Sequence, residues 1–179
     1  MFLAALKMPH GVSDYEVHQH LHLQFNRPDR PFLFRRDNHC TSLIHMLSIE
    51  RPMCPSVELS LDRLRPQYPM PFAADLIITR STSIPGQRGQ RRDVRDHDDR
   101  RKWLREKLNE CADVPFARMN ERWLQLPNGT RRLVVSTTGT LVITDAARFA
   151  ARLQAGIGRG RAFGCGLIWI PEVMDGLAN

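Results

Sequence analysis

The chain has 179 residues, enough for one large domain or two small ones, and carries a net charge of +7. Nearly all of its 26 basic residues are arginine, since only Lys7, Lys102 and Lys107 are lysine. Arginine matches phosphate with two parallel hydrogen bonds, so this charge favours a nucleic-acid partner. The four cysteines form no C-x-x-C pair, which argues against a zinc site and a disulfide framework. These scattered cysteines make a reducing cytoplasm the default location, and because no apolar run is long enough to cross a membrane, we expect no membrane partner.

The first part of the chain predicts strands and helices in the order β-α-β-β-(α)-β. Ser13 or Asp14 is a suitable cap for a helix over residues 14–25, in which apolar side chains recur every four positions. The other expected elements are strands over 1–8, 32–35, 41–49 and 75–82 and a short helix over 56–64, with breaks at Pro66, Pro69 and Pro71. This order is typical of a ferredoxin-like unit, which we expect to cover residues 1–83.

A basic segment follows at residues 84–99. It has few apolar side chains and carries Arg88, Arg91, Arg92 and Arg95, with aspartates that offset part of the charge. Such a composition is typical of a solvated hinge, and equally of a loop that contacts a nucleic acid.

Residues 100–179 predict a second and reduced ferredoxin-like unit. Helices are expected over 100–111 and, after a cap at Thr144 or Asp145, up to Ala155. Thr138-Gly139 predicts the turn of a hairpin between strands 133–136 and 140–143, and residues 163–170 a last strand, while 116–126 is ambiguous. The expected fold class is therefore α+β, with two tandem ferredoxin-like domains and a C-terminal glycine-rich loop.

The loop over residues 156–166 contains five glycines and two arginines, Arg159 and Arg161. Its spacing does not fit G-x-G-x-x-G, and it lacks the Gly-Lys-Ser/Thr of a phosphate loop, so a nucleotide cofactor is not expected. Glycine permits close backbone approach and arginine binds phosphate, so the loop suits a polyanion. The alternative is a glycine-rich connection that only packs against its own sheet.

Three histidines alternate in the first expected helix, at His18, His20 and His22. On a helix His18 and His22 share a face, and two histidines four residues apart are compatible with zinc, but no carboxylate or cysteine completes the set. Tyr15 and His18 are three residues apart and therefore neighbours on the helix surface. A phenol beside an imidazole is a suitable acid–base pair for cleavage of RNA, whose own 2′-hydroxyl serves as nucleophile without a metal.

These stretches carry a family resemblance. Tyr-x-x-His early in the first helix, a basic middle segment and the terminal G-I-G-R-G-R-A-F-G-C-G-L resemble the CRISPR repeat-cleaving endoribonucleases of the RAMP superfamily, in particular the group that matures guide RNA for type I-E Cascade. The resemblance implies metal-independent cleavage of a repeat hairpin to a 2′,3′-cyclic phosphate, without a cofactor. It also implies that the enzyme stays bound to the guide RNA and joins the other effector-complex subunits, in a type I-E or a type IV system.

The resemblance also assigns residues. His18 matches the catalytic histidine and Tyr15 its partner, and Arg161 stands where many members have lysine, beside Arg159. The loop glycines of the family match Gly156, Gly158, Gly164 and Gly166. Arg88, Arg91, Arg92 and Arg95 are the further expected RNA-binding residues, and no residue is assigned to a metal.

Two other functions remain open at this stage. A non-catalytic RNA-hairpin-binding subunit on the same fold would bind without cutting and would not need His18. A metal-dependent hydrolase that uses His18, His20 and His22 would lose its activity in a chelator.

Overall fold

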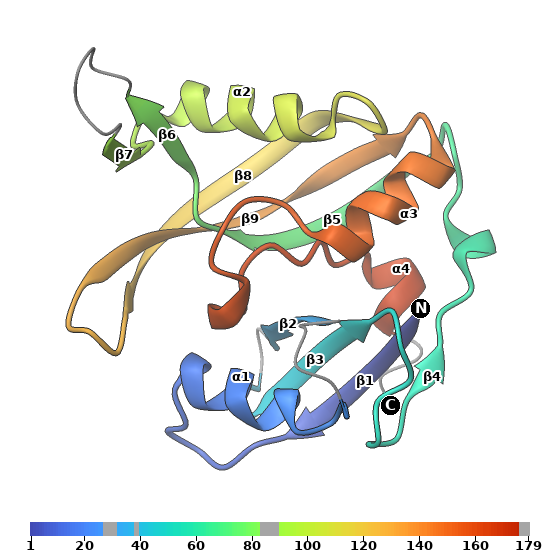
Figure 1. The fold of residues 1–179 in the computed structure, drawn as a ribbon. Coiled ribbons are helices and arrows are strands. Elements are labelled where there is room, and N and C mark those ends of the chain that lie inside the picture. The colour runs from blue at the N-terminus through green and yellow to red at the C-terminus, as the bar shows by residue number, and fades with distance from the viewer. Residues whose placement is uncertain (27–31, 38–39, 83–89, 176–179) are drawn as a thin grey trace.

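The computed structural model describes residues 1–26, 32–37, 40–82 and 90–175. Two main antiparallel sheets lie one above the other, and the C-terminal segment passes between them (Figure 1). Helix α1 covers the outer face of the lower sheet, and α2 and α3 cover the upper sheet. The fold is therefore α+β, as expected from the order of elements.

The first sheet has the strand order β2-β3-β1-β4. Its elements in chain order are β1 (Phe2–Lys7), α1 (Asp14–His22), β2 (Phe32–Arg36), β3 (Leu43–Ser48) and the short β4 (Val57–Glu58). All pairings are antiparallel, with β1 between β3 and β4. This is the ferredoxin-like arrangement without a second helix, since the segment between β3 and β4 contains no helix.

The second sheet has the order β5-β9-β8. Its elements are β5 (Pro69–Leu76), α2 (His97–Leu108), β8 (Ala112–Gln125), β9 (Arg131–Ile143) and α3 (Ala146–Ala155). On the free side of β5, Ala73 and Trp169 form an antiparallel bridge through two backbone hydrogen bonds of 2.9 and 2.7 Å. Trp169 thus stands where the fourth strand of a ferredoxin-like sheet would lie, so the strand order of the second unit matches that of the first.

Smaller elements connect these units. Strands β6 (Thr79–Thr82) and β7 (Gln90–Asp93) form a two-stranded hairpin before α2. The remaining elements are the 3₁₀ turns η1 (Leu61–Arg63) and η2 (Arg161–Phe163) and the short α4 (Pro171–Met174).

The two units share a hydrophobic core. Leu3, Leu33 and Leu47 of the first sheet belong to the same buried cluster as the side chains beneath α2 and α3. A second cluster fills the other face of the first sheet, where Val17 and Leu21 of α1 pack on β2 and β3. The first sheet is therefore buried on both faces, by α1 on one side and by the second unit on the other.

The expected hairpin about Thr138-Gly139 is wrong, because both residues lie inside the continuous strand β9. The glycine serves a close approach of two backbones. A Cβ at Gly139 would collide with the carbonyl oxygen of Phe116, just after the irregularity of β8 between Asp113 and Phe116. The ambiguous segment 116–126 belongs almost entirely to β8, which forms the hairpin with β9.

The expected break at Pro69 and Pro71 is also wrong, since both begin β5. In this strand the N–H of Ala73 points away from β9 and donates to Trp169. Pro69 and Pro71 alternate in step with Ala73, so their missing N–H groups remove no bond to β9.

Four further expectations need correction. The expected helix over 56–64 is the two-residue strand β4 followed by η1, and the strand expected over 75–82 is split between β5 and β6. The strand expected over 163–170 consists of the end of η2 and the single bridge at Trp169. Because β5 pairs with β9, the division between the two sheets precedes residue 69 and does not coincide with the expected division at residue 83.

Candidate RNA-binding groove and active site

The start of α1 is fixed by two sets of hydrogen bonds. Ser13 caps the helix, accepting from the N–H of Glu16, while the Glu16 carboxylate accepts from the N–H and hydroxyl of Ser13. Arg36, at the end of β2, donates to the Asp14 carboxylate at 2.6 Å and to the carbonyl of Val12. The first turn of α1 is thus held to the first sheet.

Tyr15 lies on the outer side of this turn. Its side chain is 41% exposed, and its ring centroid lies 6.4 Å from that of Phe163 in the glycine-rich loop. The structure therefore brings the N-terminal helix and the C-terminal loop together, although they are far apart in the sequence.

His18 lies on the other side of the helix. It is only 6% exposed, and its ring packs against Phe32 at 5.5 Å and Phe34 at 6.4 Å between centroids. The ring of His22 is 5.9 Å away, whereas His20 is exposed to solvent. Within the described ranges, no group of three or more His, Cys, Asp or Glu side chains is placed to hold a metal ion.

The glycine-rich loop is built by contacts to both units. The N–H of Gly166 donates to the carbonyl of Asp75 at 2.7 Å, and its own carbonyl accepts from Ile157 at 2.9 Å. Gly166 has a φ of +93°, and a Cβ there would lie 2.7 Å from the carbonyl oxygen of Ile157. A Cβ on Gly160 would lie 2.6 Å from the Ile77 side chain. These glycines therefore satisfy backbone geometry and packing, which supports the packing role considered from the sequence.

The expected loop glycines contact both units. Gly156 lies against Leu33, Gly158 against Trp103 and Gly164 against Phe34. The loop thus lies between β2 and α2, and its path determines where Arg159 and Arg161 emerge.

A basic hollow of about 380 Å³ lies beside this loop. Five cationic side chains line it and no acidic one does: Arg91 of β7, Lys107 of α2, Arg152 of α3, and Arg159 and Arg161 of the loop. Four separate segments of the chain converge there. A surface of this composition attracts the negatively charged phosphate backbone of a nucleic acid.

A second hollow of about 220 Å³ continues from the first. The two share Ile77, Thr79, Arg91 and Arg159, and the second adds Arg132 of β9 and Phe163. A third hollow then shares Phe163 with the second and reaches Tyr15. We call these three connected hollows the groove.

Some of the RNA-binding residues expected from the sequence line the groove. Arg91, Arg159 and Arg161 line it, whereas Arg92 and Arg95 are exposed but line none of its three hollows. Arg92 follows Arg91 on β7, where successive side chains point to opposite faces. The expected Arg88 lies outside the described residues.

Sequence reasoning missed three of the cations. Lys107 and Arg132 join the groove only through tertiary packing, so their spacing in the sequence carries no signal. For Arg152 the sequence did contain a signal, because this residue lies in the last turn of α3, directly before the glycine-rich loop.

Asp75 of β5 links the glycine-rich loop to the second sheet. It accepts from Ser136 at 2.6 Å and from Arg122 at 3.0 Å. Burial acts to lower the pKa of Arg122, but the charge and hydrogen bond of Asp75 outweigh it and raise that pKa. The Arg122 guanidinium is therefore charged at neutral pH, and its hydrogen bond to Asp75 helps to fix the residue whose carbonyl binds the loop.

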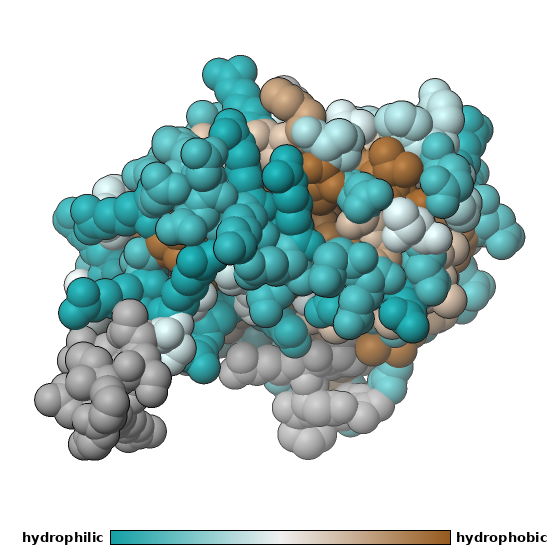
Figure 2. All heavy atoms as spheres, turned by 90° about the horizontal axis from the view of Figure 1, so that it is seen from above, coloured by the Kyte–Doolittle hydropathy of each residue, from teal (hydrophilic) through white to brown (hydrophobic). Residues whose placement is uncertain are grey.

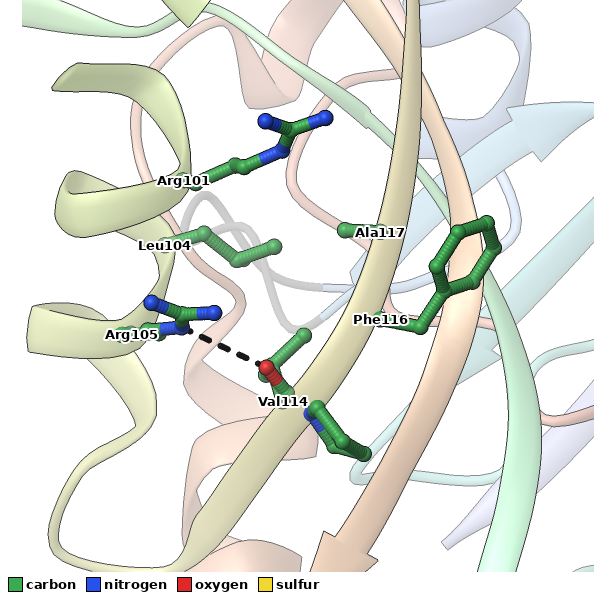
Figure 3. Close-up of a pocket in the computed structure, with 7 residues that line it drawn as sticks. Arg101, Leu104, Arg105, Val114, Phe116 and Ala117 are labelled. Atoms are coloured by element: carbon green, nitrogen blue, oxygen red, sulfur yellow. Dashed lines mark hydrogen bonds between the residues drawn. The ribbon is translucent and has the colours of Figure 1, made fainter. Parts of the chain in front are cut away.

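Another hollow lies on the opposite side of α2, against β8 (Figure 3). Arg105 reaches across to the carbonyl of Val114 at 3.4 Å, Leu104 points toward β8 between Arg101 and Arg105, and Phe116 points away from the helix. The side of the molecule seen from above is mostly hydrophilic, and the largest group of hydrophobic atoms forms one patch (Figure 2). None of the residues expected at the site lines this hollow, so we do not assign the activity to it.

Solved structures of similar fold were found by comparison. The CRISPR-associated protein Cas6e from Escherichia coli K-12 matches with a TM-score of 0.76 and 21% identity over 95% of this chain and 98% of that one. Thermus thermophilus Cse3, bound to an RNA representing a pre-cleavage complex, matches with a TM-score of 0.81 and 17% identity over 94% and 97%. A subunit of a CRISPR RNA-guided surveillance complex matches with a TM-score of 0.71 and 16% identity over 95% and 98%.

The comparison with curated proteins gave no significant match. No helix among the described residues is long and apolar enough to span a membrane. The family model described as CRISPR associated protein matches residues 7–171, which extend from the end of β1 through the glycine-rich loop. The chain therefore belongs to this family of CRISPR-associated proteins.

Proposed function

We propose that the protein is an endoribonuclease that cleaves CRISPR repeat hairpins in precursor RNA and stays bound to the resulting guide RNA in a Cascade-like complex. One observation carries the proposal: a groove lined by arginines leads from α2 and α3 to Tyr15 at the start of α1. The similar folds of an RNA-bound Cse3 and of a surveillance-complex subunit support the substrate and the partners.

Arg91, Arg159 and Arg161 hold the RNA backbone in this proposal. All three line the same hollow, and each guanidinium group can donate two hydrogen bonds to a phosphate. Arginine does not give up its proton near neutral pH, so these residues act by charge. They stabilise the negative charge that builds up on the phosphorus oxygens during cleavage.

Cleavage then uses the RNA's own nucleophile. A general base removes the proton of the 2′-hydroxyl, and the 2′-oxygen forms a bond to the adjacent phosphorus. The bond from phosphorus to the 5′-oxygen breaks, and a general acid protonates that oxygen. The products are a 2′,3′-cyclic phosphate and a 5′-hydroxyl, and the balance requires no metal, oxidant or water.

Tyr15 and His18 are the proposed catalytic residues. The Tyr15 ring already faces the groove, whereas the His18 imidazole lies between α1 and β2. In the proposal His18 rotates about its side-chain bonds when the RNA binds, since catalytic hydrogen bonds often form only in the substrate complex. The imidazole serves as general base or acid, and the phenol assists it.

The burial of His18 favours one alternative, a subunit that binds the hairpin without cutting it. A cleavage assay in EDTA with the repeat RNA of the same locus separates the two functions. We expect one cut with a cyclic-phosphate end, slowed about 10²- to 10⁴-fold by His18→Ala with hairpin affinity retained. His20→Ala is the matched control, because His20 is exposed on the same helix and should leave the rate unchanged. Binding without cleavage by the unmodified protein would favour the alternative.

A further inference from the structure

The third hollow of the groove differs in chemistry from the other two. It has a volume of about 470 Å³ and lies between the first turn of α1, the end of the β8–β9 hairpin and η2. Its lining residues are Ser13, Asp14, Tyr15, Glu16, Gln125, Leu126, Pro127 and Phe163. It is the part of the groove that Tyr15 adjoins.

The walls of this hollow are aromatic and apolar. The rings of Tyr15 and Phe163 are 6.4 Å apart at 31°, and Leu126 and Pro127 supply the apolar side opposite α1. A flat ligand could therefore stack on one of these two rings and contact the other.

The charges that line this hollow disfavour a phosphate inside it, although Asp14 is paired with Arg36. No cation lines it, while Asp14 and Glu16 do. Hydrogen bonds from the side chain and backbone of Ser13 lower the pKa of Glu16, so this group is a carboxylate at neutral pH. An anion would be repelled, and a neutral ring with amino groups at its edge would find acceptors.

The adjoining hollow has the opposite character. It shares Leu126 and Phe163 with this one, but Arg91, Arg132 and Arg159 line it. An arginine-lined hollow therefore lies next to an aromatic one across a shared wall. A nucleotide has two matching parts side by side, a charged phosphate and a flat base.

We propose that the hollow between Tyr15, Leu126 and Phe163 binds one unpaired nucleobase of the RNA, stacked on Phe163 and lying beside the bond to be cut. The inference rests on the proposed function and adds a base-binding subsite to it. Proteins that read unpaired RNA use aromatic side chains in this way, because every base has a stacking face. The subsite holds the nucleotide in position before the 2′-oxygen attacks.

The test places 2-aminopurine, one position at a time, at the nucleotides around the cleavage site of the repeat hairpin. We expect one position to lose most of its fluorescence on binding, because stacking on an aromatic ring quenches this base. Phe163→Leu keeps an apolar side chain and should restore the fluorescence and weaken hairpin binding about tenfold. Phe163→Tyr keeps the ring and should behave like the unmodified protein.

Phe116→Leu is the matched control. Phe116 is 62% exposed on β8, nine residues before Gln125, which places it about 30 Å from the hollow along the strand. It should change neither fluorescence nor binding.

The outcomes separate the two proposals. Binding and cleavage without quenching at any position, or quenching that survives Phe163→Leu, would overturn the subsite and leave the endoribonuclease intact. Absence of hairpin binding by the unmodified protein would overturn both.

Discussion

At the scale of single residues, the positions of the loop glycines and of His18 were predictable, but their surroundings were not. The loop glycines were expected to let RNA approach the backbone, but at Gly166 the close neighbour is the chain's own carbonyl at Ile157. His18 was assigned by resemblance, and the four-residue spacing of apolar side chains correctly predicted the helix that carries both Tyr15 and His18. Spacing on a helix does not reveal which face is buried when aromatic residues from β2 pack against it. The burial of His18 was therefore not predictable from its own segment.

Gly166→Ala tests the structural role of the loop. The added Cβ would be strained at a φ of +93° and would clash with the Ile157 carbonyl, so we expect a loss of about 2–4 kcal/mol in the free energy of unfolding. Gly129→Ala is the control, because Gly129 also has a positive φ, +77°, but has open space around it. It should lose only about 1–2 kcal/mol in the same denaturant titration. Equal losses would show that the contact with Ile157 is unimportant.

At the scale of elements, the segments with a clear periodicity or cap were predictable. The strands and helix of the first 50 residues lie close to their expected positions, and so does α3 with its cap at Asp145. The errors share a physical cause: tertiary pairing overrode local signals. Gly139 suggested a turn but permits a close approach to β8, and Pro69 and Pro71 suggested a break but lie where β5 needs no donor toward β9.

The residues that line the groove were likewise only partly predictable from the sequence. Arg159 and Arg161 were predictable because a glycine-rich loop presents them together, and Arg91 because it lies in a basic segment. Lys107 and Arg132 come from α2 and β9, and only the packing of these elements brings them beside the loop.

Salt dependence of binding tests the groove as a unit. Each phosphate contact releases bound counterions, so removing one contact should lower the slope of log affinity against log salt by about 1. We expect this for Arg159→Ala, measured by titrating the repeat hairpin at several salt concentrations. Arg101→Ala should leave the slope unchanged, since Arg101 lines the hollow between α2 and β8 instead. The groove assignment fails if the two variants lower the slope equally.

At the scale of the whole molecule, the two ferredoxin-like units are joined through Trp169. Its ring lies 4.5 Å from His45 and beneath the guanidinium of Arg35, at 5.6 Å, and its Nε1 donates to Asp175 at 2.6 Å. Burial lowers the pKa of Arg35, while Asp75, Asp37 and Asp175 act in the opposite direction. The contact connects both sheets and the C-terminal segment, so the two units should unfold together.

Trp169→Leu tests this coupling. We expect it to lose about 2–3 kcal/mol in the free energy of unfolding, from lost packing and from the unpaired Asp175 carboxylate. Trp123→Leu is the control at an exposed tryptophan on β8 and should stay within about 0.5 kcal/mol. Thermal unfolding followed by circular dichroism measures both variants. A Trp169 variant as stable as the Trp123 variant would contradict the role of this contact.

The central claim is that the RNA supplies the nucleophile and the protein positions it without a metal. The most direct measurement is single-turnover cleavage in EDTA of the repeat hairpin and of the same hairpin with one 2′-deoxynucleotide immediately 5′ of the cut. The account predicts cleavage of the first RNA to a 2′,3′-cyclic phosphate, and equal binding but no cleavage of the second. Cleavage of the deoxy-substituted RNA at that bond, or activity only after a metal is added, would contradict it.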